Sequence, residues 1–517
     1  MSMRITNKIM QRNNLSNINV NKVLEDKLTT QISTGKVVNR PSDDPVVAIR
    51  ALRLRSNVTE VTQYYSKNIP DAESWMTVTE DALTGLSKVL TSMISQVTKG
   101  ANGDLTSDDR GIIMTQLQAL SSEVYATGDA DYAGRYVFTG YRTDTSLSFM
   151  EKTTATYAIT EQVDKSVIDS FTFVNDGNIT DWTAANFNSI TTDETAVTES
   201  TVHRIRLAYD KCDPGMDPTI EYYDGSTDAN GNPATATMTA TTVSLYTDPS
   251  PYEQIATASG PIYVPETGEL LLDDASYNAL MNTKDNAATG AIAESEIRVT
   301  YKKTDWLATD LRPEHYFYCV DETNNIEYNT GYLDHTAERQ SIEYDVGFNT
   351  TIRVNSLASD CFKLGVGREI ADLVKALEQV TDLETTKSQI EAQIAATDAS
   401  DTATLDTLNT QLAQADKALT YAKDTCQRRF ESGITALQGY LDDTNLSITS
   451  VGSRSSKLEL IESRMQNQKT TFETLQSENE DIDVTEAAIN LASANVTYEA
   501  ALAATGKIMQ NTLLNYI

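Results

Sequence analysis

The chain has 517 residues, a formal net charge of −33 and a pI near 4.4, and 40% of its residues are hydrophobic. This length allows several domains with large buried cores, while so acidic a balance excludes a basic face for nucleic acid. No run of about 18 apolar residues occurs, so a membrane-spanning helix is excluded, and the four scattered cysteines form neither a disulfide framework nor a zinc motif.

The first segment, residues 1–42, is predicted to form a helix that is weak by itself. Its apolar residues recur at roughly helical spacing and include Ile5, Ile9, Leu15, Ile18, Leu24 and Leu28. Six asparagines lie between them, and Asn is a poor helix former. Residues 1–60 carry ten Lys or Arg and five Asp or Glu, a net charge of +5. Such a helix needs a partner of opposite charge.

Residues 43–148 are predicted to form the N-terminal part of a helical domain. A helix is expected to begin near Asp43, with Ser42 as its N-cap. Its apolar pattern continues for many turns, with a kink expected at Pro70. A second helix should be capped near Thr106 or the serine that follows it.

Residues 149–355 are predicted to form one or two β-rich modules inserted into the helical frame. Alternating stretches such as Ile297, Val299 and Tyr301 are typical of strands, and turn signals such as NDGN and PETGE separate them. All three histidines lie here without metal-ligand spacing. His315, in the run HYFYCV, is interpreted as a hydrogen-bonded structural residue.

The helical pattern returns in residues 356–480, where it predicts a hairpin that turns near 397–401 and a break at Gly452. The last segment, residues 481–517, predicts a terminal helix with a near-heptad apolar stripe. The stripe includes Leu491, Tyr498, Leu502, Met509 and Leu513. Residues 478–517 carry one Lys and six Asp or Glu, a net charge of −5.

The two ends are therefore expected to pair as complementary helices. The predicted fold is mainly α, a long-helix bundle or coiled coil formed by the N- and C-terminal segments, with the β-rich insert in the middle. The residues named above in the two terminal helices form the predicted assembly interface, which extends from Ile5 to Leu28 and from Leu491 to Leu513.

No sequence motif indicates catalysis. There is no GxxxxGK[ST], GxGxxG, GxSxG or HExxH, so we expect no enzyme activity, no cofactor and no metal. The three tryptophans, Trp75, Trp182 and Trp306, are too scattered for a sugar platform and are predicted to pack in cores.

Three stretches resemble the flagellin superfamily: MRITNKIMQRNNLSNIN near the start, NRPSDDPVVAIRALRLRS after it, and the C-terminal helix. The likeness covers about the first 150 and the last 160 residues, and NRPSDDP is its most specific part. Flagellins tend to carry an AGLAIS-like run where this chain has PVVAIR. The chain therefore resembles the hook–filament junction proteins of the superfamily more than its filament subunits.

This resemblance implies an extracellular component of the flagellar axis, exported without a cleaved signal peptide through the flagellar type III pathway. The implied partners are hook-associated protein 1, flagellin, other copies of the chain in a ring, and an export chaperone, without nucleic acid or membrane insertion. Two alternatives stay open: a filament subunit of the flagellin type, and a secreted enzyme or ligand-binding module carried in residues 149–355.

Overall fold

The computed structural model describes residues 7–103, 105–190, 194–227, 229–231, 234–284 and 296–510. The chain divides into two compact units. The first draws on Met1–Ala72, Tyr344–Ile352 and Ser456–Ile517, and the second on Glu73–Glu343 and Arg353–Ser455. The expected class, a mainly helical protein with a β-rich middle, is confirmed.

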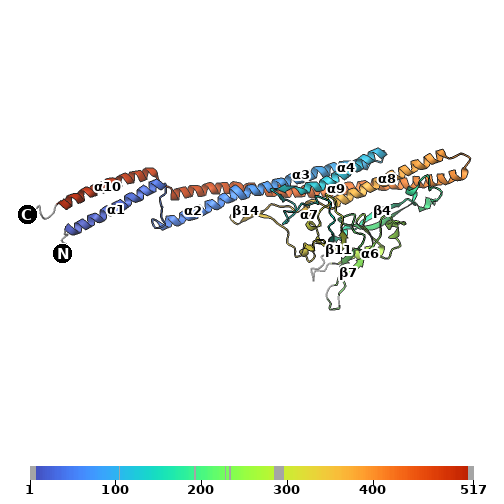
Figure 1. The fold of residues 1–517 in the computed structure, drawn as a ribbon, viewed down its shortest axis with the longest axis horizontal. Coiled ribbons are helices and arrows are strands. Elements are labelled where there is room, and N and C mark those ends of the chain that lie inside the picture. Colours follow the sequence, from blue (N-terminus) through green and yellow to red (C-terminus); the bar gives the residue numbers. More distant parts are fainter. Residues whose placement is uncertain are drawn as a thin grey trace, which may run out of the picture. The chain divides into compact units, whose positions relative to one another are not determined.

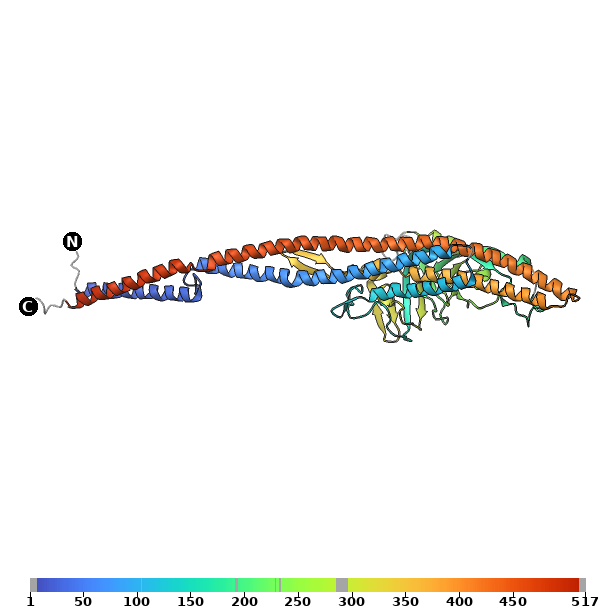
Figure 2. The ribbon, with the colours of Figure 1, turned by 90° about the horizontal axis from the view of Figure 1, so that it is seen from above.

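The first unit is built from the two ends of the chain. Its elements are α1 (Asn7–Thr34), α2 (Pro45–Gln63), a π-helical turn η1 (Tyr64–Asn68), the start of α3 (Ile69–Gly100), the end of α9 (Thr402–Glu480), α10 (Val484–Gln510), and most of the hairpin β14 (Glu343–Gly347) and β15 (Thr350–Arg353). In both ribbon views α1 lies beside α10 (Figures 1 and 2). The predicted pairing of the terminal segments is confirmed.

Helix α2 begins two residues later than the sequence suggested. Asp44, not Ser42, is its N-cap, because the Asp44 carboxylate accepts hydrogen bonds from the backbone N–H groups of Val46 and Val47. Pro45 occupies the first helical position, where no N–H is needed. A short carboxylate aimed at two free N–H groups caps a helix end as well as a serine hydroxyl does.

The irregularity expected at Pro70 lies just before it, as the π-helical turn η1. Proline cannot donate a backbone hydrogen bond, so the preceding turn widens, and the N–H of Ile69 bonds the carbonyl oxygen of Tyr64 instead. The β14–β15 hairpin packs beside this turn. Phe348 at its tip meets Tyr64 and Phe472 edge-on, with ring centroids 5.8 and 6.5 Å apart.

The second unit contains a bundle of α3, α4 (Ser107–Ala126), α8 (Gly365–Ala396) and the first part of α9. Thr106 caps α4 in a reciprocal box with Asp109, as the sequence predicted. The turn between α8 and α9 falls at residues 397–401, also as predicted. The prediction of a helix break at Gly452 is wrong, since α9 continues through this residue without interruption. A helical glycine is less favourable than alanine by only about 1 kcal/mol, and the buried Val451 and Leu458 keep the apolar stripe continuous.

The β-rich insert of the second unit holds two larger sheets. The five-stranded sheet has the order β4 (Asp169–Asn175), β5 (Thr198–Arg206), β10 (Glu269–Leu272), β9 (Ile262–Val264), β8 (Thr241–Thr242). The six-stranded sheet has the order β13 (Ile326–Tyr328), β12 (Tyr318–Asp321), β3 (Tyr157–Asp164), β11 (Glu296–Lys303), β6 (Thr219–Tyr222), β7 (Ala236–Thr239). A small ribbon, β1 (Asp131–Tyr132) with β2 (Arg135–Tyr136), and the short helices α5 (Pro251–Gln254), α6 (Asp274–Met281) and α7 (Ala358–Cys361) complete it.

The two sheets share a core, and strand β10 shows how alternation builds it. Leu270 and Leu272 point into the cluster that also contains Val299 and Trp306, on the side of the six-stranded sheet. Leu271 points the opposite way, into a second cluster beneath α5. Successive side chains of a strand face opposite sides, so one strand supplies two cores. All three tryptophans are buried, which confirms their structural interpretation.

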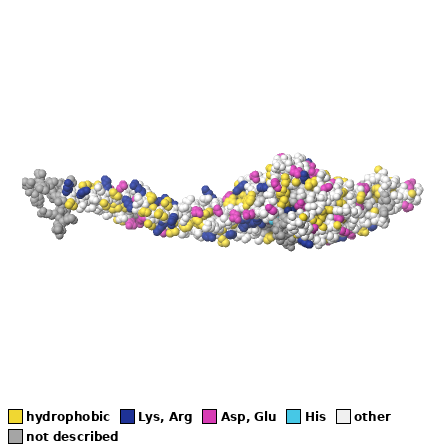
Figure 3. Space-filling model, turned by 90° about the horizontal axis from the view of Figure 1, so that it is seen from below, with side chains coloured by type: hydrophobic (Ala, Val, Ile, Leu, Met, Phe, Trp, Pro, Cys, Tyr) yellow, Lys and Arg dark blue, Asp and Glu magenta, His cyan; other side chains and the backbone are white. Residues whose placement is uncertain are grey.

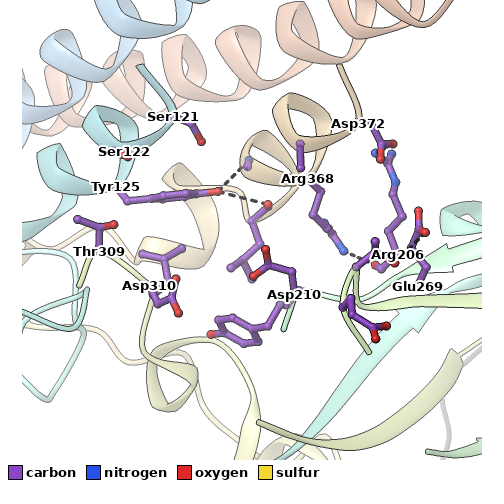
Figure 4. Close-up of a pocket in the computed structure, with 18 of the residues that line it drawn as sticks. Ser121, Ser122, Tyr125, Arg206, Asp210, Glu269, Thr309, Asp310, Arg368 and Asp372 are labelled. Carbon is purple, nitrogen blue, oxygen red and sulfur yellow. Dashed lines mark hydrogen bonds and ion pairs between the residues drawn. The ribbon is translucent and has the colours of Figure 1, made fainter. Parts of the chain in front are cut away.

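A group of ion pairs joins the five-stranded sheet to α8. The buried Arg204 of β5 pairs with Asp169 and Glu269 of the neighbouring strands and with Asp372 of α8. Arg206 pairs with Glu369 and Asp372 of the same helix, and Figure 4 labels Arg206 and Asp372. Since nearly all the N–H groups here meet carboxylates, the buried charges are compensated and the insert is held to the helical bundle.

Candidate assembly interface

Helices α1 and α10 meet along a seam with heptad spacing. On α10 the inward residues are small or apolar: Ala487, Leu491, Ala494, Tyr498, Ala501 and Thr505. On α1 the inward residues are mostly polar: Gln11, Asn14, Ile18, Asn21, Glu25, Leu28, Gln31 and Ile32. Steps of three and four residues on both helices keep the seam facing its partner, as in a coiled coil. Lys22 adds a contact at the edge, with its Nζ 5.9 Å from the centre of the Tyr498 ring.

The outer faces of the same two helices are rich in apolar side chains. Those exposed on α1 are Ile9, Met10, Leu15, Val20, Val23 and Leu24, and those on α10 are Val484, Ile489, Val496 and Leu502. Yellow hydrophobic and dark blue basic side chains both appear on the surface of this helix pair in Figure 3. A soluble helix pair would bury such apolar side chains in its seam, whereas here the inner face of α1 is mostly polar and apolar side chains are exposed on both helices, which marks an interaction site.

The predicted interface residues divide between the seam and the outside. Ile18, Leu28, Leu491 and Tyr498 lie in the seam, whereas Ile9, Leu15, Leu24 and Leu502 are exposed. Ile5 and Leu513 lie outside the described residues, and Met509 belongs to α10 but its side chain is not described. The apolar stripe read from the sequence therefore contains two surfaces, one for the partner helix and one left uncovered.

The segment that joins α1 to α2 is fastened to the segment that joins α9 to α10. The N–H of Val37 bonds the carbonyl oxygen of Glu480 at 2.7 Å, and the N–H of Ile482 bonds that of Gly35 at 3.0 Å. Gly35 has φ +69°, a left-handed conformation that glycine adopts without strain. These short links fix where the terminal helix pair leaves the rest of the first unit.

Ion pairs reinforce this joint. The side chain of Glu480, 4% exposed, accepts two hydrogen bonds from Arg55, at 2.7 and 2.6 Å, and lies 3.3 Å from Lys36 Nζ. Lys36 also bonds Asp481 at 2.6 Å. The Arg55 hydrogen bonds lower the pKa of Glu480, and the Lys36 bond lowers that of Asp481. The sequence pointed to complementary charge at the two ends but did not identify these four residues.

The second unit contains a cavity that is the alternative candidate for a functional site, since it could hold a small molecule. A cavity of about 300 Å³ lies between α4, α8 and the insert (Figure 4). Tyr125 crosses one side, where its hydroxyl accepts the N–H of Gly367 at 2.9 Å and donates to the carbonyl oxygen of Leu364. Burial raises the pKa of Tyr125 to about 12, so this phenol is a structural hydrogen-bonding group rather than a base. Arg206 and Asp372, on the opposite side, are engaged with each other.

His315 and the cysteines are likewise structural residues. His315 Nε2 lies 3.0 Å from the carbonyl oxygen of Ser146, and burial lowers the pKa of this histidine to about 4. All four cysteines are buried free thiols. Within the described ranges, no group of three or more His, Cys, Asp and Glu side chains is arranged to hold a metal, and no helix has the length and hydropathy to cross a membrane.

Comparisons with known proteins identify relatives of the N-terminal helical region. Residues 5–143 match the family model of the bacterial flagellin N-terminal helical region. Over 170 residues the chain is 30% identical to flagellar hook-associated protein 3 of Salmonella typhimurium, covering 32% of this chain and 53% of that protein. It is also 28% identical over 122 residues to a flagellin of Clostridium tyrobutyricum, covering 24% and 32% of the two chains. The chain thus spans about half the length of the hook-associated relatives that it matches.

Among solved structures, flagellar hook-associated protein 3 of Legionella pneumophila aligns with 82% of this chain and 98% of its own, at 10% identity and a TM-score of 0.26. The family model covers α1 and the capped start of α2. Residues 5–143 thus match the bacterial flagellin N-terminal helical region, and part of the chain is similar in sequence to flagellar hook-associated protein 3.

Proposed function

We propose that this chain is a structural component of the bacterial flagellum, an adaptor at the junction between hook-associated protein 1 and the flagellin filament, with no catalytic role. The observation that carries the proposal is the terminal helix pair, which exposes large apolar side chains on the outer faces of both α1 and α10. Such faces are covered when identical or related pairs pack around an axis. The chain then works by assembling into a ring outside the cell.

The relatives support the junction role over that of a filament subunit. The match to hook-associated protein 3 covers 53% of that protein, and the match to a flagellin covers 32%. PVVAIR, which includes the start of α2, also departs from the run that is usual in flagellins. A filament subunit remains the second candidate, because the flagellin match lies in the same superfamily.

Deletion of the gene tests the role directly. We expect hooks without filaments and flagellin released into the medium, with recovery when the full chain is supplied in trans. Filaments of normal length in the deletion strain would contradict the junction role. Absence of filaments without any release of flagellin into the medium would indicate that the chain is itself a filament subunit.

We also propose that an export chaperone covers the C-terminal helix before assembly, because its exposed apolar side chains invite aggregation in the cytoplasm. The test is calorimetric binding of the chaperone to a peptide of residues 485–517. Replacing Leu491, Leu502 and Met509 by Asp should abolish binding. Unchanged affinity would place the chaperone site elsewhere on the chain.

A further inference from the structure

A second cavity, in the second unit, stands out by its charge. It has a volume of about 370 Å³ and is formed by residues from the end of the insert, from α7 and from α9. The basic side chains at its wall are Arg339, Arg353 and Lys363, against the carboxylates of Asp360 and Asp443. Arg454 stands directly behind the wall. Four cations and two carboxylates give the cavity a net charge of +2, although the chain as a whole carries −33.

Most of these cations lack a carboxylate partner. Arg339 pairs with Asp360. Among the described residues, Arg353, Lys363 and Arg454 form no ion pair: Lys363 Nζ donates to the carbonyl oxygen of Ser359, and Arg454 donates to neutral oxygens alone. Burial, with Arg353 and Arg339 close by, lowers the pKa of Arg454 to about 10. The positive charges therefore repel one another, and a bound anion would relieve the repulsion.

The same cavity offers hydroxyl donors. Ser356, Ser447 and Ser450 line it. Arg454 Nη2 donates to Ser356 Oγ at 2.9 Å, so the Ser356 hydroxyl accepts from behind and keeps its own proton for a ligand in front. Guanidinium groups recognise oxyanions through paired N–H donors, and lysine adds a mobile point charge.

We propose that this cavity binds a tetrahedral oxyanion of the phosphate or sulfate class, either free or as a monoester on a small molecule. Cations and hydroxyls on several sides suit a group that presents oxygens in several directions, whereas a carboxylate presents two in one plane. The volume also suits a ligand that extends beyond the anion itself. This binding is independent of the proposed junction role.

The test is titration calorimetry of the full chain with inorganic phosphate, inorganic sulfate, glucose 6-phosphate and acetate, at constant ionic strength set with chloride. We expect saturable binding of at least one tetrahedral anion and none of acetate. Arg353→Gln combined with Lys363→Gln should weaken binding about tenfold or more, the effect of losing charge-assisted hydrogen bonds. Tighter binding of the monoester than of free phosphate would identify an organic ligand.

Lys152→Gln is the matched control, because it removes one exposed positive charge from the second unit outside this cavity. It should bind like the parent chain, and circular dichroism should show all variants folded. Lys363→Gln alone, which keeps Arg353, provides a milder variant should the double one unfold. Absence of saturable binding by every tetrahedral anion, equal binding of acetate, or equal affinity in the folded Arg353 and Lys363 variants would overturn the proposal.

Discussion

Glu480 is the residue on which the joint between the terminal helix pair and the rest of the first unit depends. Its carboxylate is nearly buried and serves both Arg55 and Lys36. Glu480→Gln should lower the stability of the first unit by roughly 1–2 kcal/mol, since the charged hydrogen bonds become weak neutral ones. Thermal unfolding followed by circular dichroism measures the change. Glu478→Gln, a charge loss at an exposed position two residues away, should leave stability nearly unchanged.

The contribution of Glu480 also depends on pH, with a sign set by its pKa. The folded-state pKa lies below the ordinary value of 4.5, so the stabilisation is fully present above that value and is lost as pH falls through the lower folded pKa. The difference in stability between the parent and Glu480→Gln should therefore be constant near neutral pH and shrink below about pH 4.5. A difference that grows on acidification would contradict the ion-pair assignment.

His315 should make the stability of the second unit depend on pH in a second range, between about pH 6.5 and pH 4. Its folded-state pKa of about 4 lies below the ordinary 6.5, so the unfolded chain takes up a proton first and stability falls as pH drops from 6.5 towards 4. The loss at pH 5 should be roughly 2 kcal/mol. NMR of the imidazole ring should show His315 neutral at pH 5, and His315→Gln should remove this part of the acid sensitivity. A ring that titrates near pH 6.5 would show that the site is not buried in solution.

At the scale of elements, the contact between the five-stranded sheet and α8 rests on Arg204. Arg204→Met should destabilise the second unit by about 3–5 kcal/mol, because it leaves the buried carboxylate of Glu269 without its cation and Asp372 with Arg206 alone. Arg428→Met is the control: that arginine is 55% exposed and pairs with Glu199 at the surface, so its loss should cost less than about 1 kcal/mol. Chemical denaturation measures the free energy of unfolding of both variants. An equal loss of stability in the two would refute the difference between the buried and the exposed ion pairs.

The terminal helices should be the least stable elements of the monomer. The inner face of α1 carries Gln11, Asn14 and Asn21, so pairing with α10 buries little apolar area, while ordering each residue costs about 1–2 kcal/mol. Hydrogen exchange of the purified monomer should therefore be fast in α1 and α10 and slow in the core strands β3 and β11. Strong protection across Leu491 to Tyr498 in a verified monomer would mean that the pair is stable before assembly.

At the scale of the whole molecule, assembly should depend on the outer faces of the terminal helices. Leu15→Asp combined with Leu502→Asp places charges on exposed positions, 55% and 45% accessible, so the stability of the second unit should stay near normal. Filament formation in a deletion strain carrying this variant should be lost, because the charges would be buried without partners between subunits. Ser16→Asp, a charge at an exposed polar position of α1, is the control. Normal filaments with the double variant would show that the outer faces of α1 and α10 are not part of the assembly interface.

The sequence by itself determined the class of the fold, the β-rich middle and the pairing of the ends. These follow from local signals: periods of 3.6 and 2, caps such as Thr106, turn dipeptides, and opposite net charges in the terminal segments. The burial of the tryptophans was predictable from the usual role of this large residue, and a structural His315 from its place in the run HYFYCV.

Only the tertiary structure decided which apolar residues of the terminal stripe face the partner helix and which face outward. Leu491 and Leu502 occupy different heptad positions of the stripe, but only the packing shows that the position of Leu491 faces α1 and that the position of Leu502 is exposed. The joint at Glu480, the Arg204 ion pairs and the basic cavity at Arg353 and Lys363 bring together residues up to 445 positions apart. Contacts across such separations leave no local pattern, because they depend on how the finished elements pack.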